Sequence, residues 1–285
     1  MQIEGPSGPA AKLPWAHLRI PPFPQVAIRI LQLTDSEVAP MRQLSTLISS
    51  EPAFASEVLT IANSALYATR SPITSVLQAI AILGTNSLKG LCLTVGIRAY
   101  LGKSLNDLTL RAIWRHSLAC ALIARQLAEI GTIDSDAAYS AGIVHDVGRL
   151  ALTVISPKPY AQLLEKHQGS ASSLLEAERA LFGFDHCEAG RHLVSDWKLP
   201  SSFEAAVSSH HCPRQKSEGW HMSDLINVSC RIADTVGFSV FRGCEITPYE
   251  DLLEELPDRE RKSFCPDKEQ LAFEISSRIN AAEAV

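Results

Sequence analysis

The stretch AAYSAGIVHDVGRLALTVIS, residues 137–156, decides the fold prediction. It is apolar on most faces, contains no proline and follows Asp134, a residue type that begins helices. We therefore expect a single buried helix from Asp136 to Ser156. His145 and Asp146 lie in its middle, and each needs a partner there, because burying an imidazole or a carboxylate alone costs free energy.

The rest of the chain repeats this helical pattern. Apolar residues recur at spacings of three and four, and Gly, Pro or Ser separate the segments. Period-two alternation over the length of a strand is almost absent, so we expect an all-α fold. The expected segments are 24–33, 41–49, 51–65, 74–83, 86–97, 109–130, 160–166, 171–182, 186–196, 202–210 and 223–237.

Composition limits the class of protein. The 285 residues are 46% hydrophobic and 20% charged, which fits a globular chain. A net charge of -5 argues against nonspecific binding to nucleic acid or anionic lipid. The seven cysteines are scattered and never spaced as CxxC, which is typical of reduced thiols. We expect no apolar stretch to reach the length needed to cross a bilayer, and we therefore expect a cytoplasmic protein without a membrane partner.

The His-Asp dyad alone leaves two interpretations open. In the first, Asp146 pairs with Arg149 and His145 bonds a backbone carbonyl. In the second, the dyad binds a metal ion together with ligands from other helices, because adjacent helical side chains diverge by about 100°. A single His-Asp pair is far less specific than a full ligand set, so on this evidence the first interpretation is favoured.

Other polar residues shift that balance. His116 is predicted in mid-helix, His186 at a helix start, the pair His210-His211 at a helix end and Asp234 on a further helical face. Taken singly, each is equally consistent with an ordinary hydrogen-bonded or capping residue. Imidazole and carboxylate together suit zinc, iron or manganese better than calcium. The sequence contains no nucleophile elbow, P-loop or dinucleotide-binding motif.

Several long motifs, in this order, resemble the HDOD family, a branch of the HD-domain superfamily used in bacterial signalling. They are IPPFPQVAIRILQL (20–33), EPAFASEVLTIANSALY (51–67), SPITSVLQAIAILG (71–84), IWRHSLACALIARQLA (113–128), AGIVHDVGRL (141–150) and FGFDHCEAGRHLVSDWKLP (182–200). The resemblance covers residues 20–237. It implies a compact helical HD-like domain with an N-terminal helical lobe.

The domain boundaries follow from that resemblance and from composition. We expect an N-terminal helical lobe over 20–105 and an HD-like lobe over 106–237. Residues 1–19 are expected to form a flexible tail. Residues 238–285 are charged and punctuated by proline, and we expect a C-terminal helical appendage there.

The resemblance also implies a ligand set. His116 matches the early metal-binding histidine of the superfamily, His145-Asp146 the signature dyad and Asp234 the late aspartate. His186 and the pair His210-His211 are similar to ligands that HD-GYP proteins, which hydrolyse cyclic di-GMP, add for further metals. The predicted metal set is therefore His116, His145, Asp146, His186, His210, His211 and Asp234, with iron, manganese or zinc as the cofactor.

Departures from the HD-GYP pattern weaken the case for catalysis. Ala112 stands where those enzymes have a metal-binding glutamate, and Arg149 stands where they have a lysine. No GYP motif follows His211. Arg149 is a candidate phosphate contact, although a guanidinium is not equivalent to an ammonium group. Hydrolysis of cyclic di-GMP at several metals is therefore not expected, and no catalytic residue is assigned.

Three functions remain to be separated. The first is a signalling module that binds unidentified signalling proteins or a nucleotide ligand, as HDOD proteins are generally thought to act. The second is a phosphohydrolase in which a metal activates water against a nucleotide or other phosphoester. The third is a helix-turn-helix over 75–95, but it offers only Lys89 and Arg98 as long basic residues, so DNA binding is not expected.

Overall fold

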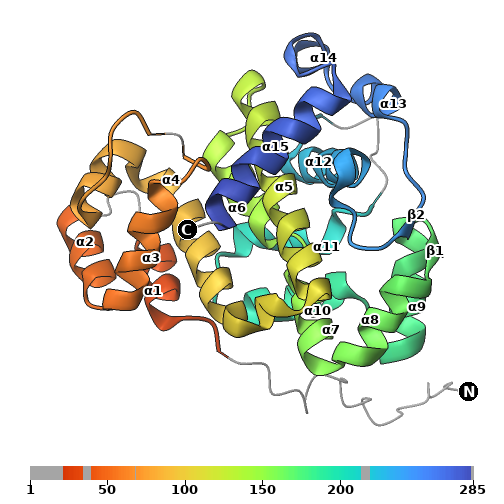
Figure 1. Cartoon of the computed structure of the whole chain (residues 1–285), viewed down its shortest axis with the longest axis horizontal. Helices are drawn as coiled ribbons and strands as arrows, with labels where there is room; N and C mark the ends of the chain where they lie inside the picture. Colours follow the sequence, from red (N-terminus) through yellow and green to blue (C-terminus); the bar gives the residue numbers. More distant parts are fainter. Residues whose placement is uncertain (1–21, 35–39, 68, 213–218, 284–285) are drawn as a thin grey trace, which may run out of the picture.

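Helices make up most of the structure, a computed structural model that describes residues 22–34, 40–67, 69–212 and 219–283 (Figure 1). The all-α prediction is confirmed. Within the described residues the strands are β1 (Gln168–Gly169) and β2 (Gly243–Cys244), which pair in parallel. The expected tail, residues 1–19, lies outside the described residues.

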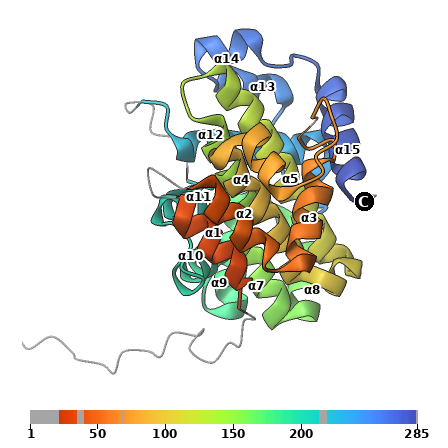
Figure 2. The same ribbon diagram turned by 90° about the vertical axis from the view of Figure 1, so that its left-hand side faces the viewer.

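The N-terminal part consists of four helices, in which three short ones pack on a long one (Figure 2). They are α1 (Gln25–Thr34), α2 (Met41–Ser49), α3 (Pro52–Ala62) and α4 (Val76–Leu101). The predicted helix end at Gly84 appears as a kink, with φ of 81° and ψ of 167°. This left-handed conformation is open to glycine at little cost.

The long helix α4 is apolar because it belongs to the core. Counted through its kink, α4 has the length and composition of a membrane span, contrary to our expectation that no stretch is long enough, and 61% of its apolar window is buried inside the fold. Leu88, Leu91, Leu93 and Val95 are each 0% exposed. These side chains therefore pack inside the protein and do not form a face for reading DNA.

A second group of helices surrounds α5 (Leu108–Ile130), which packs against α6 (Ser135–Val144) and α12 (Met222–Ala233). The contact with α6 is close: a Cβ at Gly142 would lie 2.5 Å from the Cα of Ala121, so only glycine fits there. The other elements of this part are η2 (Gly102–Asn106), α7 (Val147–Ile155), α8 (Pro157–Lys166), α9 (Ala171–Phe182), α10 (His186–Asp196), η3 (Ser201–Phe203), α11 (Glu204–Ser209) and η4 (Asp234–Phe238).

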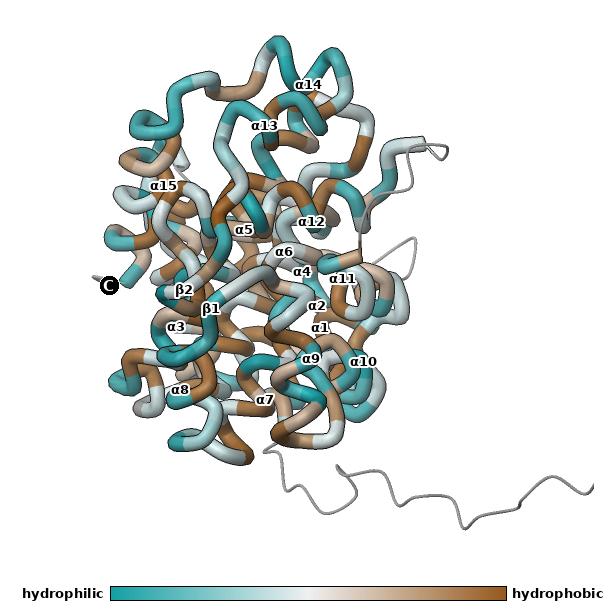
Figure 3. The backbone as a smooth tube through the Cα atoms, turned by 90° about the vertical axis from the view of Figure 1, so that its right-hand side faces the viewer, coloured by the Kyte–Doolittle hydropathy of each residue, from teal (hydrophilic) through white to brown (hydrophobic). Residues whose placement is uncertain are grey.

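The C-terminal segment is helical and returns to α5. It contains α13 (Tyr249–Glu254), α14 (Asp258–Ser263) and α15 (Lys268–Glu283). Along α15, Leu271, Ile275 and Ile279 are 0% exposed. Glu283 near its end pairs with Arg115 of α5. Figure 3 shows the contrast with α14, which is hydrophilic along its length.

Candidate metal centre

His145 and Asp146 lie at a break between two helices, which corrects the expectation of one continuous helix. α6 ends at Val144 and α7 begins at Val147. At the break, Nδ1 of His145 donates to the carbonyl oxygen of Gly142 at 2.7 Å, an oxygen that a continuing helix would pair with a backbone N–H. Nε2 of His145 lies 3.7 Å from Oδ2 of Asp146. The break therefore lets two adjacent side chains face one centre.

Three histidines present the same ring nitrogen to this centre. Nδ1 of His116, on α5, donates to the carbonyl oxygen of Phe238 at 2.9 Å. Nδ1 of His210, just after α11, donates to that of Ala206 at 3.0 Å. His145 makes the equivalent bond described above. A carbonyl oxygen only accepts, so each Nδ1 carries a proton, and in the neutral imidazole each Nε2 keeps a free lone pair.

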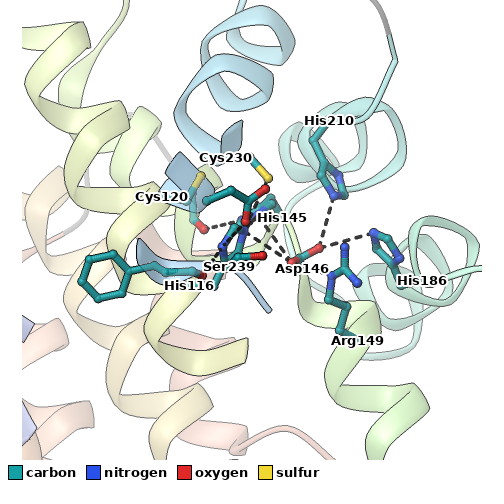
Figure 4. Close-up of polar contacts among 12 residues, drawn as sticks. His116, Cys120, His145, Asp146, Arg149, His186, His210, Cys230 and Ser239 are labelled. Carbon is teal, nitrogen blue, oxygen red and sulfur yellow. Dashed lines mark hydrogen bonds and ion pairs between the residues drawn. The ribbon is translucent and has the colours of Figure 1, made fainter. Parts of the chain in front are cut away.

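These Nε2 lone pairs converge on the carboxylate of Asp146 (Figure 4). Nε2 of His116 and of His145 each lie 3.7 Å from Oδ2, and they lie 3.4 Å from one another. Nε2 of His210 is 3.2 Å from Oδ1. All four groups are hydrogen-bond acceptors turned toward other acceptors. A divalent cation among them would satisfy the four together, so the donor set fits a metal of the HD type.

The protonation states agree with a ligand set. Burial lowers the pKa of His145 well below its usual value and also lowers that of His210. Although burial raises it, the pKa of Asp146 is held well below its usual value, chiefly by the charge of Arg149. Metal ligands must be deprotonated, and these three groups already are at neutral pH.

A second group, formed by His186 and His211, extends the cluster on the other side of Asp146. Nε2 of His186 lies 3.4 Å from Oδ1 of Asp146 and 3.1 Å from Nε2 of His211. Nδ1 of His186 contacts Oε2 of Glu178 at 2.6 Å. Burial opposes protonation of His186, but Glu178 outweighs it and raises the pKa to about 10. Without a metal, His186 is therefore an imidazolium that donates to Glu178 and His211.

The guanidinium of Arg149 lies inside this second group. It is 3% exposed, and its Nε donates to Oδ2 of Asp146 at 2.7 Å. Its two terminal nitrogens lie 3.3 Å from the hydroxyl of Tyr160 and 3.4 Å from Nε2 of His211. Glu178 is 3.5 Å away. Every guanidinium nitrogen thus contacts a protein side chain, and the phosphate contact predicted for Arg149 would have to displace one of them.

The two interpretations of the dyad use different atoms. Asp146 pairs with Arg149, and His145 bonds a backbone carbonyl, as the first interpretation required. These bonds use Nδ1 of His145 and one lone pair of the carboxylate. The Nε2 atom and the remaining carboxylate lone pairs stay turned into the cluster, and metal binding by them stays a prediction.

Asp234 lies on the far side of His116. Its Oδ1 is 3.4 Å from Nδ1 of His116, whereas Nε2 of that ring faces the centre. The structure thus gathers His116, His145, Asp146, His186, His210 and His211, and it places Asp234 behind the first of them. Their roles as ligands stay a prediction.

Two cluster residues were not singled out from the sequence. Glu178 is 0% exposed on α9; the available signal was its position one turn after Leu174, on the apolar side of that helix. Cys230 of α12 places its sulfur 3.4 Å from Nε2 of His116. Its only signal was its position one turn before Asp234.

A cleft leads to the cluster from outside. It has a volume of about 840 Å³, and His211 and Asp234 contribute to its lining. The N-terminal end of α9 and residues 254–258 form other parts of the wall. Arg231 also lines it, with both terminal nitrogens bonded to Glu255 at 2.7 and 2.8 Å. The cleft gives a small molecule a route to this edge of the cluster.

Comparison with known proteins agrees with the fold. The family model of the HDOD domain matches residues 20–213, more than half of the chain. The chain belongs to the HDOD family. The segment that departs from the HD-GYP pattern after Cys212, residues 213–218, lies outside the described residues.

Solved structures of other HDOD-like proteins share this fold. A Geobacter sulfurreducens HDOD domain protein of unknown function is 25% identical, with a TM-score of 0.65 over 93% of this chain and 91% of that one. A Marinobacter aquaeolei protein provisionally named for signal transduction is 22% identical, with a TM-score of 0.71 over 94% of this chain and 60% of that one. A Shewanella amazonensis protein provisionally named a metal-dependent phosphohydrolase is 17% identical, with a TM-score of 0.64 over 92% and 94%.

One curated relative is longer than this chain. An uncharacterized protein of Treponema pallidum is 24% identical over 199 residues, which are 68% of this chain and 38% of the relative. The chain therefore spans less than half the length of that protein.

Proposed function

We propose that this HDOD protein is a signalling module that binds one divalent transition metal at the HD-type centre and acts by binding a partner protein or a nucleotide, without hydrolysing it. The observation that carries the proposal is the position of Arg149. Its buried guanidinium pairs with Asp146 and contacts His211. It therefore lies in the second group of the cluster, the half that would hold a second metal.

The two halves of the cluster differ in charge. Around His116 and His145, two Nε2 atoms face Oδ2 of Asp146, and the charge nearest to them is the guanidinium of Arg149, whose Nε lies 2.7 Å from the same oxygen. Around His211, the cations Arg149 and imidazolium His186 are already present. Two unit charges 4 Å apart repel by about 4 kcal/mol at an effective dielectric constant near 20, and a divalent ion doubles that. The charges therefore favour one metal, in the first half.

A metal there would connect separate segments of the fold. Its candidate ligands come from α5, from the α6–α7 junction and from the end of α11. Imidazole and carboxylate donors suit iron, manganese or zinc. Metal loading would thus stiffen the packing of three helices, which is a structural role that needs no turnover.

A hydrolysis screen tests the absence of catalysis. Purified full-length protein loaded with iron, manganese or zinc is incubated with cyclic di-GMP, nucleoside mono-, di- and triphosphates and a chromogenic phosphomonoester. We expect no turnover above that of metal-loaded His145→Ala. Metal-dependent turnover that the His145→Ala substitution abolishes would refute the proposal.

The alternative is a metal-dependent phosphohydrolase. It is favoured by the cleft, whose volume of about 840 Å³ lies within the range of small-molecule sites and which reaches His211. The name of the Shewanella relative points the same way. Against it, a phosphate entering the cleft would have to take Arg231 from Glu255. The same screen separates the two functions.

A further inference from the structure

A cysteine side chain lies close to His116 and His145, the two histidines of the first half of the cluster. Cys230, on α12, is 2% exposed. Its Sγ lies 3.4 Å from Nε2 of His116. Together with Nε2 of His145, these atoms all lie within 4.8 Å of one another.

Four of the six edges among Cys230, His116, His145 and Asp146 are close in length to the edges of a tetrahedral metal site. Metal–nitrogen bonds of about 2.05 Å and a metal–sulfur bond of about 2.3 Å give N···N and N···O edges near 3.3 Å and N···S edges near 3.6 Å. The observed edges are 3.4 Å for His116 to His145 and 3.4 Å for His116 to Cys230. Those from Asp146 to each histidine are 3.7 Å. Each differs from the ideal by less than half an ångström.

The position of Cys230 on α12 supports the same assignment. Cys230 precedes Asp234 by four residues, so the two side chains lie on the same face of the helix, one turn apart. Asp234 is turned to Nδ1 of His116, away from the centre, whereas Cys230 faces Nε2. Of these two residues, Cys230 is therefore the one whose side chain faces the centre.

We propose that Cys230 is a thiolate ligand of the metal, together with His116, His145 and Asp146, and that it makes the centre select zinc or iron over manganese. The inference rests on the metal binding proposed above. On binding, the sulfur–hydrogen bond is replaced by a sulfur–metal bond and the proton is released to solvent, with no change of oxidation state. A soft sulfur ligand favours zinc and iron, whereas manganese prefers oxygen.

Cobalt substitution tests this ligand directly. The metal-free full-length protein is titrated with Co²⁺ and followed by absorption spectroscopy. We expect one equivalent to produce the visible bands of tetrahedral cobalt and a thiolate-to-cobalt charge-transfer band in the near ultraviolet. Cys230→Ser should lose the charge-transfer band and bind Co²⁺ at least about tenfold more weakly, as loss of a metal-supporting group does.

Cys120 provides the matched control. It is also buried in this region, but its sulfur is directed to the carbonyl oxygen of Ile226 at 4.0 Å. Cys120→Ser should therefore keep the charge-transfer band. A band that survives in Cys230→Ser, or that disappears in Cys120→Ser alone, overturns the assignment.

The outcomes separate this inference from the proposed function. Tetrahedral or other visible cobalt bands without charge transfer in the wild-type protein would overturn Cys230 ligation and leave metal binding standing. No cobalt binding at all would overturn both. If Cys230→Ser does not fold, X-ray absorption of the wild-type zinc protein decides: a sulfur neighbour at about 2.3 Å supports the proposal, and a shell of nitrogen and oxygen alone overturns it.

Discussion

The Nε2 atoms of His116 and His145 face one another across 3.4 Å, although the Nδ1 atom of each ring carries the proton. Two buried lone pairs in this position repel unless a cation lies between them. Asp146 adds a carboxylate oxygen 3.7 Å from each. This arrangement is the physical basis for a metal centre beside His116 and His145. The neighbouring group around His211 already contains the cations Arg149 and His186.

Metal should stabilise the protein through His145. At a free metal concentration about a hundredfold above the dissociation constant, the gain is about 2.7 kcal/mol, or roughly 5 to 10 °C in the midpoint of thermal unfolding. Scanning calorimetry of chelated and metal-loaded protein measures it. His145→Ala should abolish the shift, whereas His192→Ala, at a more exposed histidine on α10, should keep it. An equal shift in both variants would contradict a metal at this centre.

Removing the buried cation should destabilise the fold. Arg149→Met leaves Asp146 and Glu178 without their guanidinium partner, and breaking a buried pair in this way costs about 3 to 5 kcal/mol. Urea unfolding of metal-free protein measures the change. The control Arg261→Met removes surface pairs to Glu254 and Asp258 and should cost less than about 1 kcal/mol. Equal losses would show that Arg149 is not the charge that holds this half together.

Gly148 should tolerate no side chain. A Cβ there would overlap the carbonyl oxygen of His186 and lie 2.6 Å from the backbone nitrogen of Gly190. Gly148→Ala therefore forces α7 away from α10, and we expect a loss of about 1 to 3 kcal/mol or more. Gly219→Ala serves as the control in the same thermal unfolding assay, because the atoms nearest to a Cβ there belong to His221 and lie 3.7 Å away or farther. A stable Gly148→Ala protein would contradict this close packing.

Stability of the metal-free protein should fall at alkaline pH through His186. Its folded-state pKa of about 10 lies above the ordinary value of 6.5, so its stabilising contribution is complete below about pH 6.5 and is lost as pH rises through about 10. His186→Asn removes the titrating group. Urea midpoints measured from pH 6.5 to 10 should therefore fall more steeply for wild type than for this variant. Parallel curves would contradict the His186–Glu178 pairing.

Much of the fold was accessible from the sequence because the helices are marked by ordinary signals. Asp134 accepts a bond from the backbone N–H of Ala137 and begins α6, as its residue type predicts. Gly84 interrupts α4 at the predicted residue. The family resemblance, confirmed by the domain match, ordered these elements into one architecture.

The break at the dyad could not be predicted from hydrophobic periodicity. The side chains around the break are buried: Ile143, Val144 and Val147 are each at most 1% exposed. A segment buried on all sides has no polar face whose phase would reveal a bend. The continuous helix from Asp136 to Ser156 was therefore wrong at the two residues that matter most for the site.

The partners within the cluster were also beyond the sequence pattern. Glu178 sits in the stretch LLEAERALF, where a helical glutamate is usually exposed. Cys230 resembles any small buried residue of α12. Only the three-dimensional packing of α9 and α12 against the dyad brings these groups to His186 and His116.

The central claim is tested most directly by metal analysis of the purified full-length chain. The protein is expressed in medium supplemented with iron, manganese and zinc, and metal per chain is measured by inductively coupled plasma mass spectrometry. The account predicts about one equivalent in the wild type and a loss of most of it in His116→Ala. Background metal in the wild type, or the same content in both proteins, would contradict it.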